Sequence, residues 1–504
     1  MVERIREGSA APVRGVAVAV AELSAFLGAP VIGPGDVGDM LLHDVVDDSR
    51  TVCPGDAYVA IPGQRWHGLD FEDQAASAGA IVAISDRPSA VLPTVVVDDP
   101  RAVVGPLAAW FHRRPSREVR VFGVTGTNGK TSTAHFVDAG LDAAGEATAL
   151  ISGLRIRGPG WDVVPARTTP EAATLQRTLA HFRHEGVTAC AMEVSSHAIR
   201  QHRVDGTSFR AMAFTNLSHD HLDYHGTVEA YYRTKAAMFT ADRTEIAVVN
   251  VDDAYGARLA RGCNATTWAC STESPRADVY ADDISCSETG GRFTAHTPHG
   301  TVRVLLQTLG PHQIGNAVLA LTSLIADGID IGAAADGISS LTGIAGRCEP
   351  VYAGQDFTAI VDYMHNVAGQ HALLPYLRSL TSGRLIVVIG ATGGRDRSKR
   401  RPLGEVAAGY ADVVIVTDES PEDDDPATLR AEVLAGARRR GDAAVFEEPS
   451  RHLAFELAVA TTRAGDVVVV AGRGSDTVAR YGPHAYHFSD HAHLHHVIAA
   501  AVGH

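Results

Sequence analysis

The stretch GVTGTNGKTS, residues 123–132, indicates the fold class of the chain. It follows a short apolar run at 119–122 and precedes a helical pattern at 133–144. A glycine-containing turn between a strand and a helix N-terminus directs backbone N–H groups and the positive end of the helix dipole toward an anion. The sequence therefore predicts a phosphate-binding loop within an α/β domain.

The residues of this loop fit the roles of a nucleotide site. The strict spacing Gly-x-x-x-x-Gly-Lys is not met, because Val124 stands five residues before Gly129, so the loop is a variant. We expect Lys130 to reach the terminal phosphates and the Thr131 hydroxyl to hold Mg²⁺. The alternative is an ordinary turn, which the strand–turn–helix context disfavours. The expected nucleotide-binding residues of the loop are Gly126, Thr127, Asn128, Gly129, Lys130, Thr131 and Ser132.

The composition is that of a soluble globular protein, with 45% hydrophobic and 20% charged residues among 504. Lys plus Arg is 44 and Asp plus Glu is 59, so the net charge is −15, which argues against a general nucleic-acid or anionic-membrane binder. The six cysteines form no Cys-x-x-Cys pair and indicate thiols of a reducing compartment. No apolar run approaches the ~18 residues of a membrane helix. We expect a cytoplasmic enzyme, a monomer, without nucleic-acid or membrane partners.

Turn signals divide the chain into three expected units, which makes the fold class α/β with three domains. Residues 1–115 form a small α/β domain, 116–349 a central domain with a mostly parallel sheet around the phosphate loop, and 350–504 a Rossmann-like domain. A polar, proline-containing break at 113–116 is the expected linker. The expected helices are 16–28, 70–80 and 133–144, and the expected strands are 58–61, 81–84, 95–97, 119–122, 189–192, 211–214, 246–249, 359–361, 385–389, 413–416 and 467–470.

Chemically dense runs follow three of the central strands, and in parallel sheets such residues gather where ligands bind. Glu193 and His221 could ligate a hard divalent ion there, and Mg²⁺ fits better than zinc because it keeps waters and favours carboxylate and phosphate oxygens. The alternatives are a helix-capping role for Glu193 and hydrogen-bonded structural roles for His219 and His225. Lys235 lies in an expected helix, and its spacing alone predicts a surface lysine without a function.

Several longer motifs carry information that composition and spacing cannot give. These motifs resemble those of the Mur ligase family through all three units, from about residue 47 to residue 474. The subgroup most resembled is MurE, which adds the third amino acid of the peptidoglycan stem to UDP-MurNAc-L-Ala-D-Glu. The motifs are TGTNGKTS (125–132), TTPE (168–171), MEVSSHAIRQHRV (192–204), FTNLSHDHLDYHG (214–226), YYRTKAAMF (231–239), VNVDD (249–253), GPHQIGNAVLAL (310–321) and GRCEPV (346–351).

The resemblance implies an ATP-dependent ligase that uses Mg²⁺ and joins an amino acid to a UDP-MurNAc-dipeptide bound by the N-terminal unit. ATP phosphorylates a substrate carboxylate to an acyl phosphate, and the amine then displaces phosphate, so that the protein mainly positions groups and neutralises charge. The implied catalytic residues are Lys130, Glu193, His221 and Lys235. Thr131 would bind the first magnesium, and Glu193, His221 and a CO₂-carbamylated Lys235 the second.

Further contacts are implied for both substrates. Asn316 and Arg347 would contact the nucleotide, and Asp362 its ribose. The residues implied to bind the UDP-MurNAc-peptide are Ser49, Thr168, Thr169, Ser195, Gln201 and Arg203. Those expected near the incoming amino acid are Arg395, Asp418, Glu419, Glu422, Gly472 and Asp476.

The third unit departs from the family pattern in places that bear on the amine. The usual DYAHTPD is DYMHNVAG at 362–369, and the usual GKGHE is GRGSD at 472–476. The DNPR of enzymes that select meso-diaminopimelate is replaced within DESPE at 418–422, so that Glu422 stands where an arginine would pair with the distal carboxylate. Two carboxylates repel each other, so we expect the enzyme to refuse meso-diaminopimelate and to prefer another amine, such as lysine or another basic amino acid. The alternative is that this acidic run is a solvated loop.

Two rival functions stay open. The first is a MurE-like paralogue that ligates an amino acid to a different carboxylate in specialised metabolism. The second is a nucleotide-binding scaffold that has lost ligation, which the joint presence of Lys130, Thr131, Glu193, His221 and Lys235 disfavours. The histidine-rich stretch from His484 to His496 could bind metal, but surface histidines on a C-terminal helix are the simpler interpretation.

Overall fold

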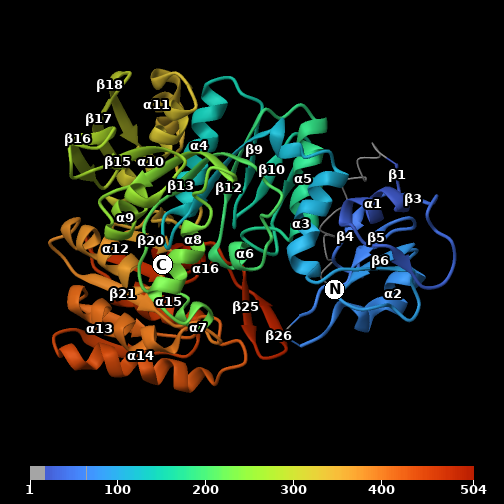
Figure 1. Ribbon diagram of the computed structural model, residues 1–504. Coiled ribbons are helices and arrows are strands. Elements are labelled where there is room, and N and C mark those ends of the chain that lie inside the picture. The colour runs from blue at the N-terminus through green and yellow to red at the C-terminus, as the bar shows by residue number, and fades with distance from the viewer. Residues whose placement is uncertain (1–16, 64, 504) are drawn as a thin grey trace.

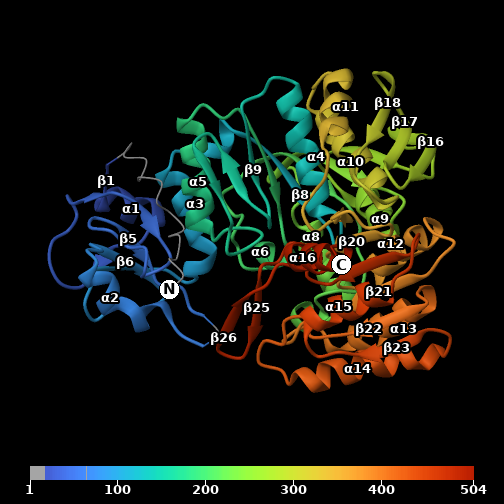
Figure 2. The same ribbon diagram turned by 180° about the vertical axis from the view of Figure 1, so that it is seen from behind.

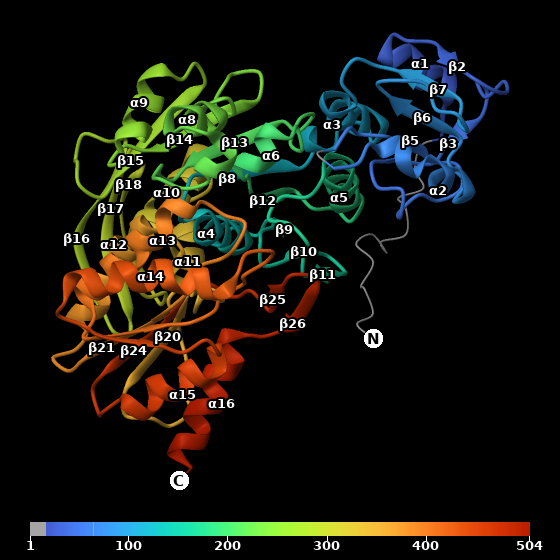
Figure 3. The same ribbon diagram turned by 90° about the horizontal axis from the view of Figure 1, so that it is seen from below.

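Three sheets, each formed by one continuous segment of the chain, divide the molecule into three α/β units (Figure 1). The computed structural model describes residues 17–63 and 65–503, and the expected helix start at Val16 lies outside them. The N-terminal unit lies at one end of the molecule and the C-terminal unit packs beside the central one (Figure 3). This arrangement confirms the predicted fold class. Among the described residues, no helix is both long and apolar enough to cross a bilayer.

The N-terminal unit is a five-stranded sheet in the order β2-β7-β6-β5-β4. The helix expected at 70–80 is shorter, because Gly79 has a φ of +103°, a left-handed conformation that turns the chain into the next strand. The expected linker at 113–116 is a tight bend, since Arg113 and Arg114 both have positive φ. The elements are β1 (Val18–Ala19), α1 (Val20–Leu27), β2 (Val31–Ile32), β3 (Leu41–Leu42), β4 (Val45–Val46), β5 (Ala57–Val59), η1 (Gly68–Phe71), α2 (Glu72–Ser77), β6 (Val82–Ser85), β7 (Thr94–Val96), α3 (Pro100–Phe111) and η2 (Pro115–Arg117).

The central unit is built on an eleven-stranded sheet in the order β11-β10-β9-β12-β8-β13-β14-β15-β16-β17-β18. The seven strands β9, β12, β8, β13, β14, β15 and β16 run parallel to one another, and the strands at both ends are antiparallel. Alternate residues of β8 serve opposite cores, as a pleated strand requires. Phe122 and Val124 pack with α4, α10 and α11, whereas Val121 packs with α5 and α8.

The strands of this unit begin and end as follows: β8 (Arg120–Thr125), β9 (Thr148–Ile151), β10 (Ile156–Gly158), β11 (Trp161–Val163), β12 (Ala189–Glu193), β13 (Phe209–Phe214), β14 (Thr244–Asn250), β15 (Thr266–Ser271), β16 (Val279–Ser287), β17 (Gly290–Thr297) and β18 (Gly300–Leu306). The helices are α4 (Lys130–Ala143), α5 (Ala172–His184), α6 (Ser196–Arg200), α7 (Leu222–His225), α8 (Val228–Ala236), α9 (Ala254–Gly262), α10 (His312–Ala326) and α11 (Ile331–Ser340). The helix expected to start at Thr133 therefore starts at Lys130.

The C-terminal unit is a six-stranded sheet in the order β19-β20-β24-β21-β22-β23, parallel apart from β19. The hairpin of β25 and β26 extends away from this sheet (Figure 2). The expected boundary at 349/350 falls within β19, and the expected domain limits stay a prediction. The elements are β19 (Glu349–Pro350), β20 (Thr358–Asp362), α12 (Val367–Ser379), β21 (Leu385–Ile389), η3 (Arg397–Lys399), α13 (Arg400–Tyr410), β22 (Val413–Val416), α14 (Pro426–Arg440), β23 (Ala444–Glu447), α15 (Arg451–Thr461), β24 (Val467–Ala471), β25 (Val478–Tyr481), β26 (His484–His487) and α16 (Asp490–Val502).

Candidate active site

The phosphate loop joins the end of β8 to the start of α4, and two of its glycines are required by their surroundings. Gly126 and Gly129 have φ values of +149° and +87°. A Cβ on Gly126 would lie 1.8 Å from Thr215 Oγ1, and one on Gly129 would lie 2.2 Å from Asn316 Oδ1. The loop is therefore packed against the end of β13 and against α10, which places Asn316 beside it as expected.

The two polar residues that follow Gly129 are already engaged. Lys130 Nζ donates to the carbonyl oxygens of Gly126 and Thr127, at 3.1 and 2.9 Å, and desolvation lowers the pKa of Lys130. Thr131 Oγ1 accepts a hydrogen bond of 3.0 Å from Arg347 Nη2, and Arg347 lies between α11 and β19. Arg347 thus lies at the phosphate loop, where the sequence places its contact with the nucleotide.

Lys235 lies in the interior, so the prediction of a surface lysine from spacing is wrong. It is 1% exposed on α8, and its Nζ donates to Gly126 O at 2.8 Å. The same Nζ lies 4.6 Å from the ring centre of Tyr231, one turn earlier on the helix. Desolvation and the charge of Lys130 hold the pKa of Lys235 well below its ordinary value. The aromatic residue four positions before the lysine was the signal in the sequence that this helix face packs inward.

Glu193 and His221 flank the loop from neighbouring strand ends. Glu193 is 2% exposed, and its Oε1 accepts from Gly153 N at 2.8 Å. The helix-capping alternative is wrong for Glu193, because Ser195 Oγ accepts from the α6 amide of Ala198 instead. Desolvation lowers the pKa of His221 to about 3, so the imidazole is neutral at pH 7 and has a nitrogen lone pair for a metal or a proton.

Magnesium fits this site only if its other ligands come from elsewhere. Within the described part of the chain, no three His, Cys, Asp or Glu side chains converge where they could hold a metal ion. Mg²⁺ commonly keeps several waters and binds through one or two carboxylates plus substrate phosphates. Glu193, His221 and the Thr131 hydroxyl can supply the few ligands that such an ion takes from the protein.

Two histidines of the 215–226 run, His219 and His225, are held by hydrogen bonds of their rings. His225 Nε2 lies 3.0 Å from Ser196 Oγ, and His219 Nε2 lies 2.9 Å from Asp396 Oδ2 in the C-terminal unit. His197 stacks on the Tyr224 ring with a centroid distance of 4.3 Å. These contacts match the structural alternative weighed for His219 and His225, with His219 acting across two units.

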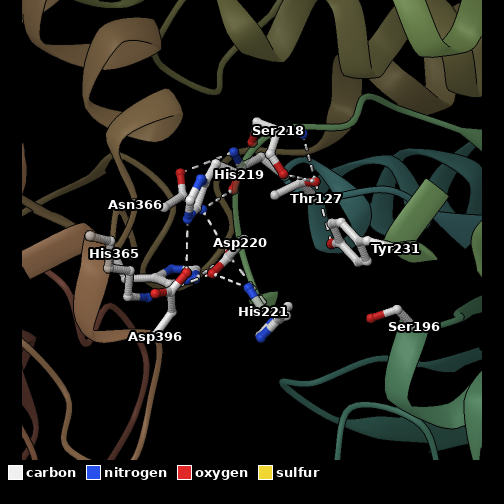
Figure 4. Close-up of polar contacts among 12 residues, drawn as sticks. Thr127, Ser196, Ser218, His219, Asp220, His221, Tyr231, His365, Asn366 and Asp396 are labelled. Carbon is white, nitrogen blue, oxygen red and sulfur yellow. Dashed lines mark hydrogen bonds and ion pairs between the residues drawn. The ribbon is translucent and has the colours of Figure 1, made fainter. Parts of the chain in front are cut away.

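A buried carboxylate that the sequence did not single out joins the central and C-terminal units. Asp220 is 2% exposed, and its Oδ2 lies 3.2 Å from His365 Nε2 and accepts from Asn366 Nδ2 at 3.1 Å (Figure 4). Lys399 Nζ is 3.6 Å from Oδ1, and Asn366 Nδ2 also donates to Asn128 Oδ1 in the phosphate loop. Burial opposes ionisation, but His365 and Lys399 hold the pKa of Asp220 well below its usual range.

Asn366 was the one hint of this network in the sequence, because it lies in the altered motif at 362–369. Its Oδ1 also caps α12 through Gly369 N, at 2.8 Å. Asp362, expected at the ribose, is buried, and its carboxylate oxygens accept from the amides of Cys348 and Met364 at 2.6 and 2.7 Å. In this structure Asp362 therefore holds the turn that carries Arg347 toward the phosphate loop.

Five of the six residues expected at the UDP-MurNAc-peptide form one cluster in the central unit. Thr169 Oγ1 donates to Glu193 O at 2.8 Å and accepts from Ser195 N at 3.1 Å, which links the cluster to the candidate metal residues. Arg203 Nη2 donates to Gln201 Oε1, and Arg203 Nε lies 3.1 Å from Glu171 Oε2. Thr168 lies beside Gly153 in the same cluster. Ser49 belongs to a separate contact in the N-terminal unit, where its Oγ donates to Gln74 Oε1 at 2.9 Å.

The residues expected to contact the incoming amino acid follow β21, β22 and β24, which are three adjacent parallel strands. These residues therefore meet at the carboxyl ends of the strands. The loops touch, because Gly393 N donates to Ser420 O at 2.9 Å. Asp418 is neutralised by Arg430, whereas Glu419 is buried and bonded to Thr392.

Two charges in these loops have no ionic partner. Among the described side chains, neither Glu422 nor the exposed Arg395 forms an ion pair. Ser420 Oγ donates to Glu422 Oε1 at 3.3 Å. Other members of the acidic run are engaged within the protein, because Asp424 pairs with Arg400 and Asp425 caps α14. Gly472 has a φ of +105°, and a Cβ at this position would lie 2.3 Å from Glu419 Oε2. Asp476 is exposed.

The C-terminal histidines gather on α16 and on the hairpin before it. His493 stacks on Phe488 with a centroid distance of 3.9 Å, and its Nδ1 lies 2.8 Å from Ser489 O. His484 and His487 are exposed on β26. These contacts match the surface interpretation of the histidine-rich stretch.

Comparison with known proteins adds the family. Residues 42–112 match the description "Mur ligase family, catalytic domain", 124–324 match "Mur ligase middle domain" and 346–474 match "Mur ligase, glutamate ligase domain". A UDP-N-acetylmuramoyl-L-alanyl-D-glutamate--2,6-diaminopimelate ligase from Streptomyces coelicolor is 41% identical over 93% of this chain and 94% of its own length. The enzyme of the same description from Corynebacterium efficiens is 40% identical over 94% of this chain and 93% of its own length.

Solved structures agree with this comparison. A ligase structure of the same description has a TM-score of 0.65 and 26% identity, covering 97% of this chain and 100% of that one. A MurF ligase from Thermotoga maritima, at 18% identity, shares the fold alone, with a TM-score of 0.65 over 91% of this chain and 98% of that one. With relatives at 41% and 40% identity over 93% and 94% of its length, this chain belongs to the Mur ligase family and is an ATP-dependent ligase.

Proposed function

We propose that this chain catalyses ATP-dependent amide formation between UDP-MurNAc-L-Ala-D-Glu and an amino acid other than meso-diaminopimelate, in peptidoglycan precursor synthesis. The observation that carries the proposal is the convergence of two lysines on one carbonyl, since Lys130 Nζ and Lys235 Nζ both bond to Gly126 O. Lys130 and Arg347 at a phosphate loop suit a polyphosphate, whose negative charge these two groups neutralise.

The chemistry needs positioning more than it needs a protein nucleophile. A carboxylate oxygen of the dipeptide bonds to the γ-phosphorus of ATP, and the bond from that phosphorus to the β-phosphate oxygen breaks, which releases ADP. The amine nitrogen then attacks the acyl carbon, the carbon–oxygen bond to phosphate breaks, and the nitrogen loses a proton. Lys130 and Arg347 orient and neutralise the phosphoryl group, and Mg²⁺ when bound supplies further charge neutralisation.

Lys235 is proposed to carry a carbamate. An uncharged amine is the nucleophile that CO₂ requires, and desolvation beside Lys130 keeps the pKa of Lys235 well below its ordinary value. The nitrogen bonds to the CO₂ carbon and releases a proton, so that a buried neutral amine becomes an anion with two oxygens. Together with Glu193 and His221 this group would hold magnesium near the transferred phosphoryl group.

The choice of amine is argued from Glu422. The curated relatives named above are described as ligases for 2,6-diaminopimelate, whose distal centre carries a carboxylate as well as an amine. Glu422 has no ionic partner among the described residues, so a second carboxylate beside it would meet uncompensated repulsion of ~1–4 kcal/mol at ~4 Å. A side-chain ammonium would gain a similar attraction, which favours lysine or another basic amino acid.

A panel of amino acids tests this proposal. Purified protein is incubated with ATP, Mg²⁺, UDP-MurNAc-L-Ala-D-Glu and either lysine, ornithine or meso-diaminopimelate, and phosphate release is measured while mass spectrometry identifies the joined product. We expect release that requires both the nucleotide-sugar peptide and a basic amino acid. Strong turnover with meso-diaminopimelate alone would end the amine assignment. ATP cleavage that ignores both acceptors would instead favour a scaffold, and turnover only with another carboxylate would favour a paralogue.

Charge reversal at Glu422 gives a second prediction. In Glu422→Arg, we expect kcat/KM for lysine to fall about tenfold or more, ~1.4 kcal/mol, and kcat/KM for meso-diaminopimelate to rise, because the side chain then attracts the distal carboxylate. The matched control is Asp423→Arg, which makes the same charge change at the exposed neighbouring position. Equal effects of the two variants would show that bulk charge of the loop, and not Glu422, sets the preference.

A further inference from the structure

A fully buried carboxylate, Asp490, is the first residue of α16. It lies near the loops at 418–422 and 472–476, which the proposed function assigns to the incoming amino acid and which are called the amino-acid loops below. Asp490 is 0% exposed, and its Oδ1 and Oδ2 accept from Arg451 Nε and Nη2 at 2.8 and 2.5 Å. Arg473 Nε lies 3.6 Å from the same Oδ1. Two guanidinium groups, one from α15 and one from the loop after β24, therefore share one carboxylate.

The two arginines hold the backbone of both amino-acid loops. Arg451 Nη1 donates to Asp418 O at 3.4 Å and Nη2 to Ala471 O at 3.0 Å. Arg473 Nη1 donates to Glu419 O at 3.1 Å, and its Nη2 donates to Asp476 O at 3.1 Å. The loops at 418–422 and 472–476 are thus held through their carbonyl oxygens, whereas the carboxylates of Glu422 and Asp476 take no part in these contacts.

This arrangement depends on the charge of Asp490. Two cations are buried with one hydrogen-bonded anion, and Arg473 Nε has no hydrogen-bond partner of its own among the described atoms. A buried cation that loses its carboxylate is strongly destabilised, and carbonyl dipoles alone do not replace the missing charge. Without the carboxylate, the two guanidinium groups would repel each other and shift, and the backbone bound to them would shift as well.

We propose that Asp490 is a positioning residue for the incoming amino acid, acting through Arg451 and Arg473 on the two loops that carry Glu422 and Asp476. The inference rests on the proposed function, in which these loops bind the amino acid. It assigns to the C-terminal helix a part in amine selection, although Asp490 is buried away from any ligand. The phosphate loop and the cluster proposed for the UDP-MurNAc-peptide lie in the central unit, away from the loops at 418–422 and 472–476, so binding of these two substrates should depend little on Asp490.

The test is the Asp490→Asn variant of the full chain, which keeps the side-chain shape and removes the charge. We expect KM for the amino acid to rise about tenfold, with KM for ATP and for the nucleotide-sugar peptide within about twofold of wild type. The control is Asp466→Asn, since Asp466 is also a buried partner of an arginine, Arg384, in the same unit and at the opposite end of the sheet. It should lower thermal stability without changing KM for the amino acid.

Hydrogen exchange of the unliganded protein gives a readout that does not depend on activity. We expect faster exchange of the amides at 418–422 and 472–476 in Asp490→Asn than in Asp466→Asn. If Asp490→Asn does not fold, Arg473→Lys keeps the charge but loses the forked donor, and the same two effects are expected. Unchanged loop exchange, or an equal rise in all three KM values, would overturn the inference. A wild-type protein that joins no amino acid would contradict the proposed function instead, and the exchange result would still decide the positioning role.

Discussion

Replacing Lys235 with alanine is expected to lower kcat for ligation at least a hundredfold, about 3 kcal/mol of transition-state stabilisation. The residue is buried against the phosphate loop, where an alanine leaves neither an amine for CO₂ nor a carbamate for magnesium. Phosphate release with ATP, the nucleotide-sugar peptide and the preferred amino acid measures the loss. Because carbamate formation needs the neutral amine, wild-type activity should rise with pH through the lowered pKa of Lys235 and should depend on bicarbonate.

Two controls separate this role from packing. Arg233→Ala removes an exposed cation from the same helix and should leave kcat within about twofold of wild type. Acetate or another short carboxylate can occupy the space left in Lys235→Ala and should restore part of the activity, because it replaces the missing oxygens. If Lys235→Ala retains full activity, or if wild type is indifferent to bicarbonate, the carbamate assignment is wrong.

Lys130→Ala is expected to abolish acceptor-dependent phosphate release, with a loss well over a hundredfold, about 3 kcal/mol or more. The ammonium lies on the phosphate loop at the carbonyls of Gly126 and Thr127, from where it can turn toward a terminal phosphate. Without it, charge that develops during phosphoryl transfer lacks its main protein partner. ATP affinity, measured by calorimetry, should weaken as well.

The unliganded melting temperature tells whether Lys130→Ala fails for a structural reason. Among the described residues, the Lys130 ammonium bonds only to backbone carbonyls of its own loop, so its removal should change thermal stability little. A variant that is as stable as wild type but inactive supports the proposed role. A variant that still releases phosphate at the wild-type rate would show that Arg347 and Lys235 suffice, and the assignment of Lys130 would fall.

Much of the fold could be predicted because the signals are local. Runs such as 385–389 and 467–470 are apolar at every position, which predicts strands covered on both faces, and the structure buries them completely. Boundaries were less certain. The apolar periodicity predicted a start of α4 at residue 133, because Lys130, Thr131 and Ser132 are polar. The helix begins at Lys130, and Gly129 caps it in a left-handed conformation.

The sequence by itself determined the phosphate loop, the order of three α/β units and the family, because each depends on residues close together in the chain. Only the tertiary structure decided that Lys235 is buried, that Asp220 joins two units and that Asp490 pairs with the arginines bonded to the loops at 418–422 and 472–476. The physical reason is that the cost of burying a charge depends on partners that arrive from distant segments, as His365 and Lys399 reach Asp220. No local pattern reports such partners, so those roles became visible only once the chain was folded.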